Sequence, residues 1–286
     1  MRGLLDPKMD LVFKNIFGSE KHPNILISFL NATLKPKDLI TAVEIKNTDL
    51  NKGYIEDKFS RLDVKATTSN NEIINIEIQL KNEYNMIKRS LFYWSKLYSE
   101  QLNEGEDYSV LKRTICINIL NFKYLKTRKF HSGCRLKEIY SNEELTDVAE
   151  IHFIEIPKLE EGTDEKDMLV AWIEFLKNPE SEKGRSLEMS IDEIREAKDE
   201  LIRMSNDDTQ RELYEMRAKT LKDKISALNE AERKGIKKGR QEGIKEGEKS
   251  KAIEIAKSLI NIGLDKETIS KSTGLDLNEV EKLMSK

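Results

Sequence analysis

The chain has 286 residues, of which 35% are charged and 38% are hydrophobic, and its formal net charge is −3. This length is enough for a hydrophobic core of about 150 to 200 residues with an extension. No stretch reaches the roughly 20 apolar residues that span a membrane, and the start lacks the apolar run of a signal peptide. Cys116 and Cys134 have no CxxC or zinc-like spacing, which is typical of a reducing compartment. We therefore expect a cytoplasmic protein that does not enter a membrane.

The N-terminal part of the chain predicts two helices followed by a β-hairpin. Helical spacing of apolar residues and period-2 alternation distinguish the two kinds of element. In chain order, the predicted elements are helices over 10–17 and about 24–32, a strand or loop at 42–50, and strands at 59–68 and 72–80. The intervening "SNN" is a good turn sequence, so the last two strands are expected to pair as an antiparallel hairpin.

A helix and three more strands follow. The helix is predicted over 85–102, with an apolar side formed by Ile87, Leu91, Trp94, Leu97 and Tyr98. Residues 112–122 are apolar on both faces, which indicates a central strand. Further strands are predicted at 135–141 and 150–159. Residues 1–160 therefore predict an α/β fold, a mixed-sheet core flanked by helices.

Residues 161–286 predict an all-helical C-terminal extension. We divide it into a helical region over 161–232 and a charged tail over 233–286, with a long helix from about 207 into the 240s. Gly235, Gly239, Gly243 and Gly247 recur every four residues. Because each glycine costs a helix about 0.5–1 kcal/mol relative to alanine, one interpretation is a flexible linker. The other is a helix whose glycine stripe lets a second backbone approach, giving a homo-oligomer such as a dimer.

The last 37 residues predict three short helices, whose order and spacing resemble those of a helix-turn-helix. Asp265 is a candidate cap for the second helix, and Asp276 with Glu279 resembles a capping box for the third. Since Asp276, Glu279 and Glu281 make the final helix acidic, it fits the major groove of DNA poorly. We expect a small packing or assembly module. Upstream, residues 233–251 carry a local charge of +5, from eight basic and three acidic residues. This charge favours either weak phosphate binding or an ordinary solvated helix face.

Two acids on the predicted hairpin stand out. Alternate residues of a strand share a face, so Glu77 and Gln79 point away from the core, and the hairpin brings Asp63 alongside Glu77. Two carboxylates on one face repel each other unless a cation lies between them. One interpretation is a Mg²⁺ or Mn²⁺ site. The other is a solvated polar face on which Arg61 and Lys65 pair with the acids.

Together with other motifs, this hairpin resembles the Rpn family of recombination-promoting nucleases and transposases, in the PD-(D/E)XK nuclease superfamily. The similarity is carried by "RLDVKA…NEIINIEIQ", by "DLVFKNIFG" at 10–18, by the helix at 87–108 and by "FHSGCRL" at 130–136. The glycine-by-four tail is also typical of that family. The resemblance implies a restriction-endonuclease-like core and a divalent-metal-dependent DNA endonuclease that acts in recombination, transposition or defence.

The resemblance also implies the site. Asp63 and Glu77 would be metal ligands for Mg²⁺, with Mn²⁺ possible, and the backbone carbonyl of Ile78 a further ligand. Gln79 takes the position of the superfamily's catalytic lysine; it can orient water but adds no charge. We infer that Lys65, on the face of Asp63, supplies that charge. A cleavage-weak, DNA-binding regulatory protein with the same fold is the alternative.

Several other side chains are candidates for supporting roles. Asp10, on the first helix, is a candidate auxiliary acid, or else a first-turn acid of that helix. Lys14, Arg89 and Tyr93 are candidate DNA contacts; Arg89 and Tyr93 lie four apart and so face the same way. A packing tyrosine with an exposed arginine is the alternative for that pair. His131 is either catalytic or structural.

Overall fold

A computed structural model describes residues 3–46, 63–160, 162–163 and 167–285. The chain divides into two compact units, Met1–Lys219 and Thr220–Lys286. The first unit is built on a six-stranded mixed sheet with the order β1-β2-β3-β4-β6-β5. The strands are β1 (Val43–Lys46), β2 (Val64–Thr68), β3 (Ile73–Gln79), β4 (Thr114–Leu120), β5 (His131–Lys137) and β6 (Glu144–Glu155). The predicted mixed-sheet α/β core is confirmed.

The predicted hairpin is the β2–β3 pair. Its strands are antiparallel, with Val64 opposite Ile76, and Asn71 turns the chain with a left-handed φ of 62°. Asp63 directly precedes Val64, so it comes level with Glu77. β3 then pairs in parallel with β4, and β4 with β6. The residues predicted at 59–62, including Arg61, lie outside the described part of the chain.

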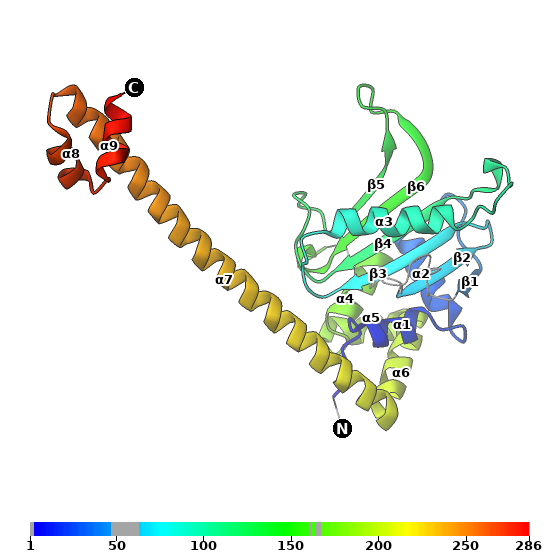
Figure 1. Ribbon diagram of the computed structural model, residues 1–286. Coiled ribbons are helices and arrows are strands. Elements are labelled where there is room, and N and C mark those ends of the chain that lie inside the picture. The colour runs from blue at the N-terminus through cyan, green and yellow to red at the C-terminus, as the bar shows by residue number, and fades with distance from the viewer. Residues whose placement is uncertain (1–2, 47–62, 161, 164–166, 286) are drawn as a thin grey trace. The chain divides into compact units, whose positions relative to one another are not determined.

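Helices cover both faces of the sheet (Figure 1). α3 (Met86–Ser99) lies on one face. The other face carries the aromatic core, in which Phe17, Phe29 and Trp172 make edge contacts with ring centroids 5.3–6.5 Å apart. Its helices are α1 (Asp10–Phe17), α2 (Pro23–Leu34), α4 (Met168–Lys177), α5 (Glu182–Ser190) and α6 (Asp192–Asn206). β3 is therefore buried on both sides, and the acid on its α3 side does not face solvent.

The face that α3 turns to the sheet differs in part from the predicted one. Ile87 and Leu91 are 46% and 50% exposed. Leu97 is buried as predicted, and Trp94 and Tyr98 are partly buried, but Met86, Ser90 and Tyr93 take the buried places expected for Ile87 and Leu91. Ser90 donates a hydrogen bond to the Asn118 side chain on β4, at 2.8 Å. Because this face of the sheet is polar, it requires polar partners from the helix, and this requirement outweighs the apolar pattern of α3.

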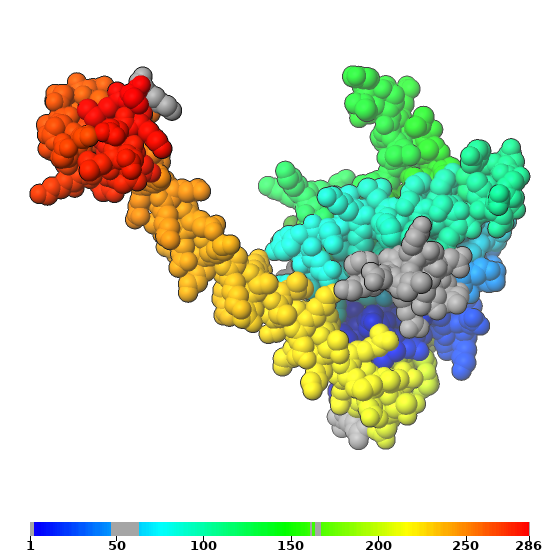
Figure 2. Space-filling view, in the orientation of Figure 1, coloured from blue at the N-terminus to red at the C-terminus, as the bar shows by residue number. Residues whose placement is uncertain are grey.

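The last two strands also begin and end elsewhere than predicted. The strand predicted at 135–141 is β5, which begins at His131, and the one predicted at 150–159 is β6, which runs from Glu144 to Glu155. Register shifts at Arg135–Lys137 show an irregular pairing that period-2 reasoning does not detect. The ends of these strands form an arm that stands out from the rest of the first unit (Figure 2).

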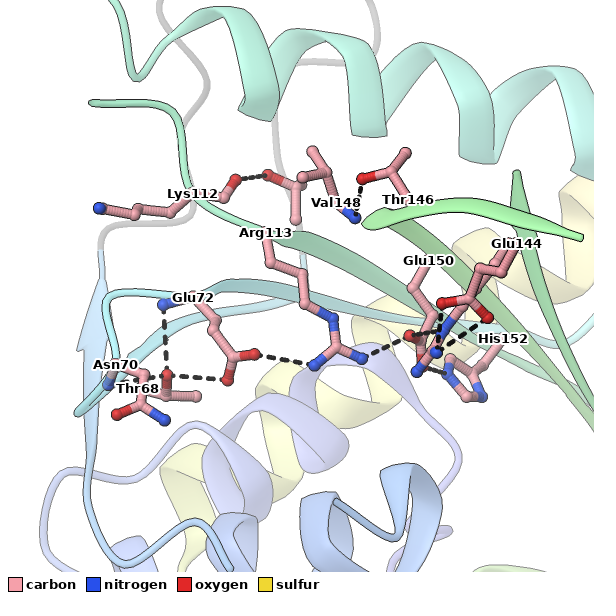
Figure 3. Close-up of polar contacts among 12 residues, drawn as sticks. Thr68, Asn70, Glu72, Lys112, Arg113, Glu144, Thr146, Val148, Glu150 and His152 are labelled. Atoms are coloured by element: carbon pink, nitrogen blue, oxygen red, sulfur yellow. Dashed lines mark hydrogen bonds and ion pairs between the residues drawn. The ribbon is translucent and has the colours of Figure 1, made fainter. Parts of the chain in front are cut away.

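Buried ion pairs connect β3, β4, β6 and β5 at the ends of the strands (Figure 3). Arg113 lies between Glu72, at 2.8 Å, and Glu150, at 2.5 Å, and Arg135 also binds Glu150. Glu150 in turn accepts a hydrogen bond from the His152 ring. Burial opposes ionisation of Glu150, but the bonds from His152, Arg113 and Arg135 outweigh it and lower the pKa to about 2.

We expect Glu150→Gln to lower the free energy of unfolding by about 3 kcal/mol, because it leaves two arginines facing a neutral group in a buried network. Glu144→Gln is the matched control. Its side chain is 42% exposed and also pairs with Arg135, so the loss should stay below about 1 kcal/mol. Urea unfolding at pH 7 measures both values, and equal losses would contradict the importance of the buried network.

The second unit consists of helices. Its members are the C-terminal part of α7 (Asp208–Asn261), α8 (Lys266–Thr273) and α9 (Leu277–Met284). Ala256, Ile269, Leu275 and Val280 form its core. The predicted cap Asp265 is confirmed, since it accepts from the Thr268 backbone N–H. Asp276 likewise accepts from the Glu279 backbone N–H, but the Glu279 carboxylate, the other half of the predicted capping box, pairs with Lys249. None of the helices in the described residues is long and apolar enough to cross a membrane.

The glycine-by-four segment is helical. All four glycines lie inside α7, so the linker interpretation is wrong. Strong helix formers surround them, and ion pairs such as Lys234–Glu230 and Lys238–Glu242 add support at i,i+4 spacing. A Cβ added at any of the four would meet nothing within 4 Å in the described chain. Close packing inside the chain therefore does not account for the glycines.

Candidate active site

Asp63 lies at the entrance to β2, where the hairpin meets α1. Its Oδ2 accepts a hydrogen bond from the backbone N–H of Ile78 at 2.8 Å. Burial raises the pKa of Asp63 to about 6, against the lowering effect of this hydrogen bond. The charges of Asp10, Arg89 and Lys14 also act on Asp63; the first raises the pKa and the other two lower it. A carboxyl that is harder to ionise than a free aspartate thus lies where three charged residues act on it.

Glu77 lies in the middle of the α3-covered face, with 2% of its residue surface exposed. The solvated-face interpretation is therefore wrong for this acid. Burial, followed by the charge of Asp63, raises the pKa of Glu77 to about 8. Its Oε2 pairs with the Arg89 guanidinium at 3.2 Å, whereas Oε1 is buried with no hydrogen-bond partner in the described chain. The charge of Asp63 therefore acts on Glu77, and one oxygen of the Glu77 carboxylate lacks a hydrogen-bond partner in the described chain.

Arg89 and Tyr93 point from α3 toward the acids. Arg89 contacts Glu77 and reaches the Gln79 Oε1 at 3.5 Å, the outer limit of a hydrogen bond. Its guanidinium lies 5.4 Å from the centroid of the Tyr93 ring. Burial raises the pKa of Tyr93 to about 12, so the phenol stays protonated. The alternative of a packing tyrosine with an exposed arginine does not hold for Arg89, which is a direct partner of Glu77.

A cavity of about 640 Å³ opens beside Asp63. Asp10 and Lys14 of α1 line it together with Asp63, Glu200, Arg203 and Arg217, and Glu77 is not among the described residues in its wall. Arg217 forms an ion pair with Asp10. The cavity therefore places Asp63 and Asp10 beside Lys14 and two arginines, of which Arg203 pairs with Glu200 in the same wall.

Two other candidates lie away from the acids. Lys65 pairs with Glu100 at 3.4 Å, so Arg89, rather than Lys65, is the cation that contacts Glu77. His131 stacks on His152 and lies 2.8 Å from it, on the side of the network around Glu150. Burial and the neighbouring His152 lower the pKa of His131 to about 4, so this imidazole is neutral at pH 7.

Some contributors were not predicted from the sequence. Arg203 and Arg217 line the cavity from helices that lie about 200 residues after α1 in the chain. No local sequence pattern predicts that these arginines come close to α1. Asn75 hydrogen-bonds to Glu77 and lowers its pKa. The period-2 pattern of β3 contains that signal, since Asn75 and Glu77 share a face.

A mixed sheet that presents a buried acid, a partly buried acid and an amide from neighbouring strands, flanked by helices, defines a nuclease-like core of the PD-(D/E)XK type. The chain matches the model of the PD-(D/E)XK nuclease family transposases over residues 7–231. It belongs to that family. Residues 249–285 match the C-terminal helix-turn-helix domain of the Rpn/YhgA-like nuclease family. No curated protein and no solved structure gives a significant match to the chain.

The helix-turn-helix match corrects the expected packing module. We discounted DNA binding because the final helix is acidic. Two of its acids are paired within this unit, Glu279 with Lys249 and Glu281 with Lys266 at 2.6 Å, while Asp276 caps the helix. The negative charges of these acids are thus partly neutralised by lysines of the same unit. Counting the charges on the final helix alone overstated how strongly that helix repels DNA. The nuclease family and the helix-turn-helix domain together indicate a nuclease-related function with DNA binding.

Proposed function

We propose that this protein is a divalent-metal-dependent DNA endonuclease, which hydrolyses phosphodiester bonds in recombination, transposition or defence. The observation that carries the proposal is the pair of acids, of which Glu77 is buried and Asp63 is partly buried. Asp63 and Glu77 repel each other, and Glu77 Oε1 has no partner in the described chain. A cation between them would relieve both costs. Its setting would be the cytoplasm, with DNA as the partner.

The residues present fit a hard divalent ion. Asp63 and Glu77 supply carboxylate oxygens and Ile78 a backbone carbonyl, the ligand types that Mg²⁺ and Mn²⁺ prefer. The described residues contain no cluster of three or more His, Cys, Asp or Glu that could hold a metal. With two acids and one carbonyl as protein ligands, water would have to complete the coordination. Once bound, such an ion activates water and stabilises charge on the phosphate.

The other side chains have roles that follow from their contacts. Arg89 offsets the charge of Glu77 and fixes the orientation of its carboxylate. The Gln79 amide, beside Arg89, orients the attacking water without adding charge. Lys14 and Arg217 line the cavity next to Asp63 and attract the DNA backbone, while Asp10 is held by Arg217 as an auxiliary acid. Lys65 pairs with Glu100 and takes no part in the proposed site.

Nicking of supercoiled plasmid tests the proposal. We expect conversion to open circles with Mg²⁺ or Mn²⁺, and none with Ca²⁺ or EDTA. Binding of the plasmid without cleavage under every metal condition would favour the alternative, a DNA-binding regulatory protein that keeps the nuclease fold. The helix-turn-helix domain is the observation that keeps this alternative open, because it can bind DNA without any cleavage.

We also propose that the protein forms a homo-oligomer, such as a dimer, through α7. The four glycines face open space in the single chain, which suits close approach of a second helix. We expect Gly239→Leu with Gly243→Leu to shift light-scattering mass toward the monomer, although leucine has the higher helix propensity. The control, Glu242→Leu on the same helix, should leave the mass unchanged. A parent chain that is monomeric at all concentrations would contradict this proposal.

A further inference from the structure

The loop between β4 and β5 carries a concentrated positive charge. Its ten residues, 121–130, read "NFKYLKTRKF" and contain four basic and no acidic side chains, in a chain whose net charge is −3. Lys123, Lys126, Arg128 and Lys129 are all exposed. None of the four forms an ion pair within the described residues. The charge is therefore not neutralised locally, unlike that of most basic residues on this sheet.

The loop is held in place by buried charged groups. Glu155, which is fully buried, accepts hydrogen bonds from the backbone N–H groups of Tyr124 and Leu125. The Lys158 ammonium donates to the carbonyls of Leu125 and Thr127, each at 2.7 Å, and pairs with Glu155. These contacts fix the backbone that carries the basic side chains. Because the loop backbone is already ordered, binding a ligand there costs less loop entropy than binding to a flexible loop would.

The loop begins at the same end of the sheet as the acids. Asn121 donates its backbone N–H to the carbonyl of Gln79 at 2.9 Å, and Gln79 is two residues beyond Glu77 on β3. The Tyr124 hydroxyl lies 3.4 Å from the backbone nitrogen of Ile87, near the start of α3. Since β3 and β4 are parallel and in register, the basic loop extends directly from the catalytic end of the sheet.

We propose that this loop is a second contact for the phosphate backbone of the duplex held at the site, distinct from the cavity beside Asp63. The inference rests on the proposed function, because it takes DNA as the substrate. Duplex DNA carries one charge per about 1.7 Å of axis, so a fixed row of cations meets several phosphates at once. These contacts position the duplex and read no sequence, since exposed lysines bind phosphate as point charges.

The test measures how duplex binding depends on salt, in EDTA so that no cleavage occurs. The full-length protein is titrated onto a fluorescent 30-base-pair duplex by anisotropy, for the parent and two double variants. The loop variant is Lys126→Gln with Lys129→Gln. The control is Lys112→Gln with Lys137→Gln; both lysines are exposed and lie at the opposite end of β4 and β5. Each double variant removes two positive charges.

We expect the loop variant to lose about 1.8 from the slope of log K against log salt, at roughly 0.9 per phosphate contact. Between 50 and 200 mM salt, the parent should then lose about tenfold more affinity than the loop variant. The control should keep the parent slope. Equal slopes for the loop variant and the parent overturn the inference. This holds even if the loop variant binds another polyanion, such as heparin, more weakly than the parent does. Plasmid nicking is scored separately, so failure of the endonuclease proposal and failure of this inference are distinguishable.

Discussion

Glu77→Gln is expected to reduce plasmid cleavage by at least about 10³-fold while leaving the fold intact. The variant keeps the size of the side chain and an oxygen that accepts from Arg89, but it removes the charge that would hold the metal. A bound metal ion stabilises the transition state by several kcal/mol, and each 1.36 kcal/mol corresponds to a tenfold change in rate. Losing the metal ligand should therefore cost about 10³-fold or more in rate. Initial rates of nicking with Mg²⁺, at saturating DNA, measure the effect. Asp63→Asn should behave similarly.

The matched control for this change is Glu72→Gln. Glu72 belongs to the same hairpin and pairs with Arg113, away from Glu77. Its rate should stay within about threefold of the parent, and the circular dichroism spectra of all three variants should match that of the parent. If Glu77→Gln and Glu72→Gln cleave equally well, Glu77 is not a catalytic residue and the proposed site is wrong.

Without metal, the protein should lose stability as the pH rises from about 4 to 8. Burial raises the pKa of Asp63 from 3.8 to about 6 and that of Glu77 from 4.5 to about 8. The unfolded chain releases these protons near pH 4, whereas the folded chain holds them longer. The folded state therefore binds more protons in this window, and its stability falls with rising pH.

Comparing the parent with Glu77→Gln isolates this effect from the other titrating groups. At pH 4 the two unfolding free energies should be similar, and by pH 8 the variant should be more stable by an amount on the order of 4 kcal/mol. Urea unfolding in EDTA at several pH values gives the two curves. Curves that run parallel from pH 4 to 8 would show that Glu77 is not held in its protonated form by the fold.

The hairpin could be predicted from sequence because strand alternation has a strict period of two. Once the turn at Asn71 is recognised, Asp63 must come level with Glu77. The partner of Glu77 could not be predicted in this way. The apolar pattern of α3 favoured Ile87 and Leu91 as the buried face, but the sheet beneath presents Asn75, Glu77 and Asn118, and these groups require Arg89 and Ser90.

Long-range partners are the other part that sequence reasoning did not reach. Arg217 is 207 residues from Asp10 in the chain, and their ion pair depends on how α7 begins beside α1. The acidic final helix gave a wrong prediction for a related reason, since the lysines that offset Glu279 and Glu281 lie on other helices. Charge patterns along one element do not reveal partners contributed by another element.

The most direct test of the account is diffraction from crystals soaked in Mn²⁺, with data collected at a wavelength where manganese scatters anomalously. We predict an anomalous peak between the carboxylates of Asp63 and Glu77, within about 2.0–2.3 Å of one oxygen of each, and its absence in Glu77→Gln crystals. The metal-dependent mechanism would be contradicted if Mn²⁺ bound at full occupancy only at other positions in the crystal. In that case no peak would lie between the two acids, and Glu77 would still pair with Arg89.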